Sequence, residues 1–189
     1  MNPARPAIFI DRDGTLNVEV GYLHRPEDVR LVPGAGEALA RVNALGVPVV
    51  VVTNQAGIGR GKYGWKEFEA VTGRINELLA GHGARVDAVY AAPHHPEGIG
   101  EYAHPDHPDR KPNPGMLLRA AGELGLDLAR SWMIGDKPID VEAARNAGCR
   151  AALVLTGYGR EGDAAGADLV AADLPEALDR ILASGFGRP

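Results

Sequence analysis

The sequence predicts an α/β fold: a doubly wound parallel sheet with helices on both faces. Short apolar runs alternate along the chain with amphipathic stretches, which is typical of parallel strands joined by crossover helices. Residues 47–52 form a continuous β-branched run, as expected for a strand that is buried on both faces. The length of 189 residues favours one domain that spans residues 1–189.

The first half of the chain predicts two helices and two strands around that β-branched strand. A short apolar run predicts the first strand over residues 7–10. A helix over 35–45 follows, because its apolar residues share one face and Gly46 stops it. Apolar residues at helical spacing predict a second helix over 65–79, and a further apolar run predicts a strand over 86–91.

The second half continues the alternation. A helix is expected over 114–124, with a proline near its first turn, and a strand over 132–135. Residues 140–147 predict a helix and 151–155 a strand. A closing helix covers 175–183.

Three long stretches fit no regular element: residues 17–33, 54–64 and 92–113. The last of them holds five of the fourteen prolines and four of the six histidines. Each stretch follows the carboxyl end of an expected strand, where open α/β sheets bind their ligands. Long loops in a compact domain are functional or disordered, and their shared location favours function.

Composition narrows the class of protein. A formal charge of −5 argues against a nucleic-acid partner and against a membrane partner. Cys149 is the only cysteine, so neither an intramolecular disulfide nor a cysteine-rich zinc site can form. The apolar run near the N-terminus is too short for a signal peptide. We therefore expect a cytoplasmic monomer whose partner is a small substrate.

Polar and charged residues gather where four of the expected strands give way to loops. The residues are Asp11, Arg12, Asp13, Gly14 and Thr15 in the first set, Thr53 and Asn54 in the second, Arg110, Lys111 and Pro112 in the third, and Gly135, Asp136, Lys137 and Asp140 in the fourth. Because the carboxyl ends of parallel strands meet at one edge of a sheet, we expect these side chains to lie together.

This mixture of groups suits phosphoryl transfer. A phosphate monoester repels an anionic nucleophile, so carboxylate attack needs a hard divalent cation such as magnesium. Asp11 and Asp136 can supply carboxylate oxygens to the metal, and Asp13 its backbone carbonyl. Asp11 is then the nucleophile of a covalent aspartyl-phosphate, and Asp13 the general acid and base. Thr53 and Lys111 can hold the phosphoryl oxygens.

Each signal also has an ordinary structural interpretation. Asp and Gly are common in turns, and a Thr-Asn pair after a strand often caps a helix. Lys111 or Lys137 alone is typical of a solvated surface charge. Asp140 stands where the helix over 140–147 needs an N-cap. The ordered combination at four strand ends favours catalysis over these separate interpretations.

The chain resembles the haloacid dehalogenase (HAD)-type phosphatases. Within them it is similar to the histidinol-phosphatase and heptose-bisphosphate-phosphatase branch, through the stretches FIDRDGTLNVEVGY, VVTNQAGIGRG, PHHPEG, RKPNPGML and MIGDKPIDVEAARNAG. The resemblance covers residues 9–148. It implies a HAD-like fold, and the short gap after Asp13 leaves no room for a separate cap domain, so the three long loops must form the wall that selects the substrate.

The resemblance also implies site residues. Asp11 and Asp13 would be catalytic together with Thr53 and Lys111, and magnesium would lie at Asp11, Asp13 and Asp136. The implied substrate contacts are Arg12, Glu19, Val20, Gly21, Tyr22, Asn54, Gln55, Ala56, Arg60, Arg110 and Lys137.

The third loop departs from this branch, whose members bind zinc there through Cys-x-His and Cys-x-Cys. Those positions are Ala92, His94, His107 and Asp109 in this chain. Zinc accepts imidazole and carboxylate ligands, so His94, His107 and Asp109 could rebuild a site with His95 or His104. We favour a loop without zinc, because the thiolates are the strongest ligands of such a site.

Within the branch we favour removal of the 7-phosphate from D-glycero-D-manno-heptose 1,7-bisphosphate, a precursor of surface glycans. Five basic residues could hold the second phosphate of such a substrate: Arg60, Lys62, Arg110, Lys111 and Lys137. Histidinol phosphate is the alternative substrate. A phospho-receiver domain is the alternative from another class, but its phosphorylated aspartate follows a central strand. A polynucleotide 3′-phosphatase would need a basic surface along which the nucleic acid binds, and a net charge of −5 does not indicate one.

Overall fold

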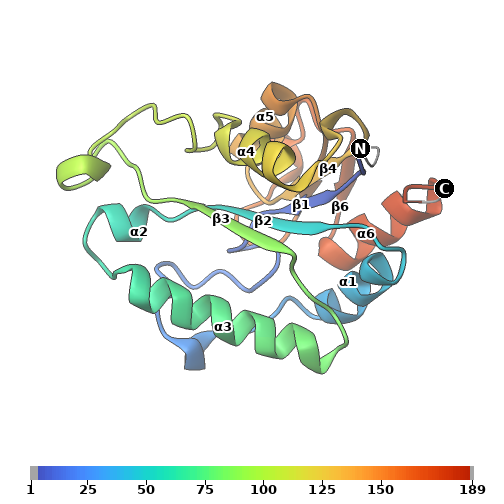
Figure 1. Ribbon diagram of the computed structural model, residues 1–189, viewed down its shortest axis with the longest axis horizontal. Coiled ribbons are helices and arrows are strands. Elements are labelled where there is room, and N and C mark those ends of the chain that lie inside the picture. The colour runs from blue at the N-terminus through green and yellow to red at the C-terminus, as the bar shows by residue number, and fades with distance from the viewer. Residues whose placement is uncertain (1–3, 188–189) are drawn as a thin grey trace.

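The computed structural model describes residues 4–187, and these contain a six-stranded parallel sheet in the order β3-β2-β1-β4-β5-β6 (Figure 1). The strands are β1 (Ile8–Ile10), β2 (Val49–Asn54), β3 (Ala88–Ala92), β4 (Trp132–Gly135), β5 (Arg150–Val154) and β6 (Leu169–Ala171). The doubly wound fold expected from the sequence is confirmed.

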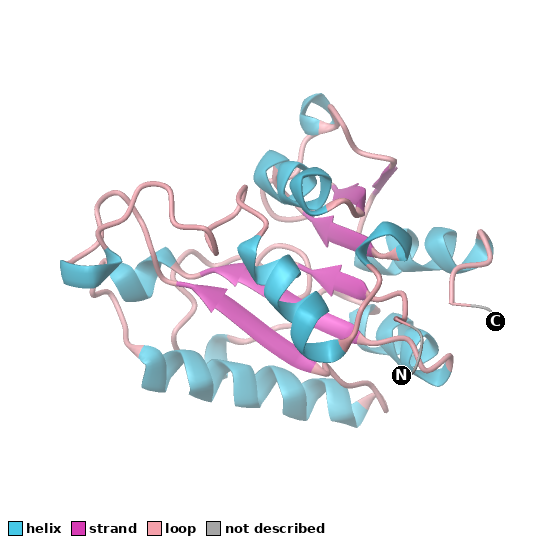
Figure 2. Cartoon of the chain, turned by 45° about the horizontal axis from the view of Figure 1, so that its top comes forward, coloured by secondary structure: helices cyan, strands magenta, loops and turns pink. Residues whose placement is uncertain are grey.

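Helices cover both faces of the sheet (Figure 2). One layer holds α1 (Ala35–Ala44), α3 (Trp65–Gly81) and α6 (Leu174–Ala183), and the other holds α4 (Gly115–Leu124) and α5 (Pro138–Ala147). Successive side chains of a strand point to opposite faces, so Ile8 and Ile10 pack into the first layer and Phe9 into the second. Burial on both faces explains why these strands are continuously apolar.

Several boundaries differ from those expected. Strand β2 runs on through Thr53 and Asn54, because both residues pair with β3. Helix α5 begins at Pro138 and not at Asp140, which occupies its first turn. The sequence analysis missed β6, a three-residue strand that pairs only with β5 among the described strands. It also missed α2 (Ala56–Gly59), whose two glycines hide its helical character.

Short 3-10 turns complete the connections. They are η1 (Pro26–Asp28), η2 (Gly100–Tyr102), η3 (Leu128–Arg130) and η4 (Glu161–Asp163). Within residues 4–187, no helix is long and apolar enough to cross a membrane.

The topology determines where a site can form. Strand β1 lies between β2 and β4, and the chain winds outward from it in both directions. Loops that leave neighbouring strands on opposite faces open a crevice at the carboxyl ends of such a sheet. The residues after β1, β2 and β4 therefore meet at the centre of one edge.

Candidate active site

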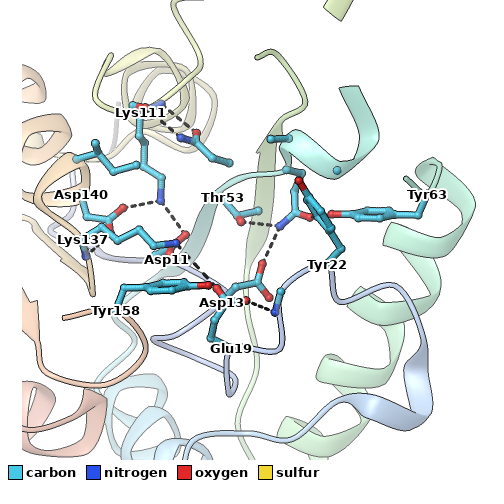
Figure 3. A pocket seen from close by; sticks show the side chains of 16 residues that line it. Asp11, Asp13, Glu19, Tyr22, Thr53, Tyr63, Lys111, Lys137, Asp140 and Tyr158 are labelled. Carbon is cyan, nitrogen blue, oxygen red and sulfur yellow. Dashed lines mark hydrogen bonds and ion pairs between the residues drawn. The ribbon is translucent and has the colours of Figure 1, made fainter. Parts of the chain in front are cut away.

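Three buried carboxylates meet at this edge. Asp11 follows β1, Asp136 follows β4, and Asp140 lies on the first turn of α5. One carboxylate oxygen from each lies within 4.8 Å of the other two. The Nζ atom of Lys111 reaches into the cluster from the third loop, 2.7 Å from Asp11 Oδ1 and 2.7 Å from Asp140 Oδ1 (Figure 3).

The cluster carries more negative than positive charge. Burial raises the pKa of Asp11 to about 7, against the lowering effect of Lys111, and burial raises the pKa of Asp136 to about 6. Burial alone would lower the pKa of Lys111, but Asp11 and Asp140 raise it, so this lysine stays charged. When all three carboxylates are ionised, one ammonium leaves two negative charges unbalanced.

A divalent cation fits this donor set. Asp136 is fully buried, and its Oδ1 atom has no hydrogen-bond partner among the described residues. A buried unpaired carboxylate oxygen is costly unless a cation or donor meets it. Carboxylate oxygens are the ligands that magnesium prefers, and the net charge of the cluster matches a doubly charged ion. Asp11, Asp136 and Asp140 are thus the side chains that could hold the metal.

Two glycines from other loops lie against the carboxylate of Asp136, and neither position has room for a side chain. A Cβ atom on Gly14 would lie 2.4 Å from Asp136 Oδ2, and one on Gly157 would lie 2.3 Å from it. Both glycines also have positive φ angles, which side chains disfavour. The backbone N–H of Tyr158 donates to the same oxygen at 2.8 Å. The loop after β5 therefore helps to hold the metal-facing carboxylate.

The carboxylate of Asp13 lies outside the three-carboxylate cluster. Its Oδ1 atom accepts from Asn17 Nδ2 at 3.0 Å, and its Oδ2 atom accepts from Gln55 Nε2 at 2.9 Å. Arg12 Nη2 lies 2.9 Å from Asp13 Oδ2. The side chain lines the cavity with Asp11 but is not among the carboxylates that cluster with Asp136, which suits a separate acid and base. The sequence-based expectation used only the backbone carbonyl of Asp13 as a metal ligand.

Hydrogen bonds join the last residue of β2 to the third loop. Asn54 Nδ2 donates to the carbonyl of Lys111 at 3.0 Å, and the N–H of Lys111 donates back to Asn54 Oδ1 at 3.0 Å. Lys111 Nζ also donates to the carbonyl of Val52 at 2.9 Å. Asn54 therefore places the lysine, and its side chain is already occupied by protein partners.

A cavity of about 390 Å³ opens above these groups. Its wall comes mainly from the first loop, the second loop and the residues after β4. The lining side chains include Glu19, Tyr22, Thr53, Tyr63, Lys137 and Tyr158 (Figure 3). Lys137 Nζ lies 4.6 Å from the ring centroid of Tyr158 and 3.9 Å from Glu19 Oε2. The cavity thus brings Lys137 and aromatic rings together with residues of the acidic cluster.

Four of the expected substrate contacts do not line this cavity. Arg12 is only 2% exposed, and its guanidinium faces Asp13 and Gln55. Val20 lines a neighbouring, more apolar cavity. Arg60 joins three loops, because it donates to Tyr22 Oη and pairs with Glu97. Arg110 donates to the carbonyl of His94 at 2.8 Å. The sequence pattern located these residues near the site but not their direction.

Three histidines of the third loop lie together, but they do not form a group of metal ligands like that of the three aspartates. The rings of His94 and His107 stack with centroids 3.3 Å apart, and His104 lies edge-on to both. His107 Nδ1 accepts from the N–H of Asp109, whose carboxylate pairs with Arg119 at 2.7 Å. Within residues 4–187, the three-aspartate cluster is the one group in which at least three such side chains each bring a ligand atom within 4.8 Å of the others.

Sequence reasoning gave two residues too small a role. Asp140 was interpreted as a helix cap, and its Oδ2 atom does accept from the N–H of Lys137 at 3.0 Å. Its other oxygen meets Lys111, so the residue serves both purposes. Tyr158 was missed, although it follows an expected strand as the other site residues do. That rule, applied to the fifth strand, would have found it.

The position of Asp11 also corrects one argument against a receiver domain. Strand β1 is first in the chain but central in the sheet, so an aspartate after a central strand does not separate the two classes. Comparison with known proteins separates them.

A family model described as HAD-hydrolase-like matches residues 109–177, which include Lys111, Asp136 and Asp140. The chain is 50% identical over 155 residues to the D-glycero-beta-D-manno-heptose-1,7-bisphosphate 7-phosphatase of Mesorhizobium japonicum, covering 82% of this chain and 71% of that one. It is 46% identical over 188 residues to the D-glycero-D-manno-heptose-1,7-bisphosphate 7-phosphatase of Thermosynechococcus vestitus, covering 94% and 95%.

A solved structure agrees with these relatives. The D,D-heptose 1,7-bisphosphate phosphatase of B. bronchiseptica, complexed with magnesium and phosphate, superimposes with a TM-score of 0.84 at 33% identity, covering 95% of this chain and 99% of that one. Identity of this extent over nearly full lengths confirms the resemblance and the phosphatase activity inferred from the strand-end motifs. The chain therefore belongs to the HAD-type phosphatases and, within them, to the family of the D-glycero-D-manno-heptose-1,7-bisphosphate 7-phosphatases.

Proposed function

We propose that this chain is a magnesium-dependent phosphatase that removes the 7-phosphate of D-glycero-D-manno-heptose 1,7-bisphosphate, in the synthesis of surface-glycan precursors. The observation that carries the substrate is 46% identity, over 94% of the chain, to a protein of that name. The cavity of about 390 Å³ is consistent with a phosphorylated sugar. That the protein is a single-domain monomer and works in the cytoplasm stays a prediction from the sequence.

In the first chemical step Asp11 is the nucleophile. Lys111 holds Asp11 Oδ1 at 2.7 Å, which leaves the second carboxylate oxygen to attack phosphorus. The bond from phosphorus to the sugar oxygen breaks, and an aspartyl-phosphate forms. Magnesium held by Asp11 and Asp136 would neutralise the charge that otherwise keeps two anions apart. Thr53, which lines the cavity, would donate to a phosphoryl oxygen.

Asp13 serves both steps as the proton-transfer group. As a general acid it donates a proton to the departing sugar oxygen, and it is then left as a carboxylate. In the second step this carboxylate takes a proton from water, and the resulting hydroxide attacks the aspartyl-phosphate. Inorganic phosphate leaves, and Asp11 is regenerated. Two residues of separation along the loop allow the two carboxylates to face different atoms.

A second phosphate has two candidate cationic partners. Lys137 lines the cavity, and half-buried Arg110 directly precedes Lys111, which also lines it. Burial lowers the pKa of Arg110, and so does the charge of nearby Arg60. Two arginines held close together are stabilised by an anion, which a bisphosphate substrate supplies.

A phosphate-release panel tests the proposal. Purified protein with magnesium is mixed with the heptose bisphosphate, histidinol phosphate and common sugar monophosphates. We expect the highest kcat/KM on the bisphosphate, with one phosphate released per molecule. A preference for histidinol phosphate would replace the substrate, and no release from any phosphomonoester would refute the proposed function.

A further inference from the structure

The side chain of Gln55 connects the acid-base residue to a phosphate-binding residue. Gln55 Nε2 donates to Asp13 Oδ2 at 2.9 Å and to Thr53 Oγ1 at 2.8 Å. Gln55 Oε1 accepts from Arg12 Nη2 at 3.2 Å and from the hydroxyl of Tyr63. A primary amide offers two donor hydrogens and two acceptor lone pairs, so this side chain is satisfied by protein groups. It is 2% exposed.

Two neighbours determine which way the amide points. The guanidinium of Arg12 is donor-only, so the atom that faces it must be the amide oxygen. The amide nitrogen then faces Asp13, which accepts when it is ionised. Exchange of the two ends would set donor against donor and acceptor against acceptor. The orientation therefore follows from chemistry and not from the choice of a rotamer.

This orientation has a consequence for Thr53. Because Gln55 Nε2 donates to it, Oγ1 uses one lone pair as an acceptor, and its own hydrogen is left to another partner. Thr53 lines the cavity, so that hydrogen is available to a phosphoryl oxygen. A different neighbour that accepted from Thr53 would turn the hydrogen away from the substrate.

The contact with Asp13 is also distinctive. The other side-chain donors to Asp13 are Arg12 and Asn17, both within four residues on the same loop. Among the described residues, Gln55 is the side chain from another strand end that reaches this carboxylate. It therefore couples the first loop to β2 at the point where proton transfer occurs.

We propose that Gln55 is a positioning residue for phosphoryl transfer, whose side-chain amide holds the Asp13 carboxylate beside the leaving group and directs the Thr53 hydroxyl hydrogen toward the phosphoryl group. This inference rests on the proposed function, because it takes Asp13 as the acid-base residue and Thr53 as a phosphate ligand.

The variant Gln55→Glu tests it with little change in volume. It presents an acceptor to Asp13 and draws the hydrogen of Thr53 away from the cavity. On heptose bisphosphate, whose alkoxide needs a proton, kcat should fall by about 100-fold, at the lower end of typical acid-base contributions. p-Nitrophenyl phosphate releases a phenolate that leaves without a proton. On this substrate the rate of the first step should fall by no more than about 10-fold.

Rapid mixing separates the two steps. With p-nitrophenyl phosphate the variant should release a burst of nitrophenolate equal to the active sites and then turn over slowly, because Asp13 also activates water. KM for the bisphosphate should change much less than kcat. Equal losses in the rate of the first step on the two substrates, or kinetics like those of the wild type, would overturn the inference.

A double-mutant cycle tests the second half of the proposal. Gln55→Met keeps the volume but removes both polar ends, and Thr53→Val removes the hydroxyl. If Gln55 acts through Thr53, the effect of Gln55→Met should shrink in the Thr53→Val background. Additive effects would overturn the proposed link. If the glutamate variant does not fold, the methionine variant provides the same comparison of the two substrates.

Controls separate this inference from the proposed function. Asn76→Asp makes the same exchange of amide for carboxylate on the exposed face of α3, and its kinetics should match the wild type. If wild-type protein hydrolyses neither substrate, the proposed function fails. If wild-type protein is active and Gln55→Glu is equally active, only the positioning role fails.

Discussion

Replacing Lys111 by methionine removes the buried ammonium that contacts Asp11 and Asp140. The variant keeps an unbranched side chain, one atom shorter, but loses contacts to Asp11 at 2.7 Å, Asp140 at 2.7 Å and the carbonyl of Val52 at 2.9 Å. The lysine side chain is 1% exposed, so solvent does not screen these contacts. Breaking a buried charge pair by removing one partner costs about 3–5 kcal/mol. For a chain of this size, Tm should fall by roughly 10 °C or more.

The loss should depend on pH in metal-free protein. Burial holds the pKa of Asp11 at about 7, above its ordinary value of 3.8, and that of Asp136 at about 6. A carboxyl whose pKa is raised by folding binds more protons in the folded state between its two pKa values. Lowering the pH from 8 to 6 therefore neutralises charges that Lys111 no longer balances. The difference in Tm from wild type should shrink over this range.

Melting curves in EDTA at pH 8 and pH 6 measure this effect, and phosphate release measures the accompanying loss of turnover. Lys66→Met is the matched control, because it makes the same change on the exposed face of α3. Its free energy of unfolding should stay within about 0.5 kcal/mol of the wild type. If Lys111→Met has the same Tm as the wild type at pH 8, a buried ammonium does not balance the charge of the cluster and our account of that charge is wrong.

Three further changes probe the nucleophile, the metal and the third loop. Asp11→Asn should lower phosphate release by more than about 1000-fold while the protein stays folded, and near-normal release would remove Asp11 from its role. Turnover should vanish in EDTA and return with magnesium. Because protons compete with the metal for Asp11, whose pKa is about 7, the apparent Kd for magnesium should rise as the pH falls below 7. A Kd for magnesium that does not change with pH would contradict this. Purified protein should contain substoichiometric zinc by elemental analysis and keep its Tm with a zinc chelator; one tight zinc per chain whose removal lowers Tm would show that His94, His107 and Asp109 have rebuilt a site.

Part of this site was predictable because it depends on the ends of strands. Asp11, Thr53 and Asp136 follow short apolar runs that read as strands from composition alone. Parallel pairing carries those ends to one edge, so convergence follows without knowledge of any contact. The same reasoning explains why Tyr158 was accessible to prediction although it was missed.

Side-chain direction was not predictable in this way. Arg12 stands between the two aspartates proposed as catalytic, yet it is buried and pairs with Asp13. Gln55 follows Thr53, the proposed phosphate ligand, by two residues, yet its amide donates to Asp13 of the first loop. Both directions depend on partners that lie about forty residues away in the chain.

Sequence by itself determined the fold class, the edge of the sheet where the candidate site lies and the residue types gathered there. These properties follow from local apolar patterning and from the parallel arrangement that such patterning requires. Only the tertiary structure decided that Asp140 pairs with Lys111, that Arg60 ties loops together, and that the amide of Gln55 points at Asp13. Each of these contacts joins segments whose relative placement depends on packing across the whole sheet. The local pattern of the sequence does not specify how segments far apart in the chain are placed in space.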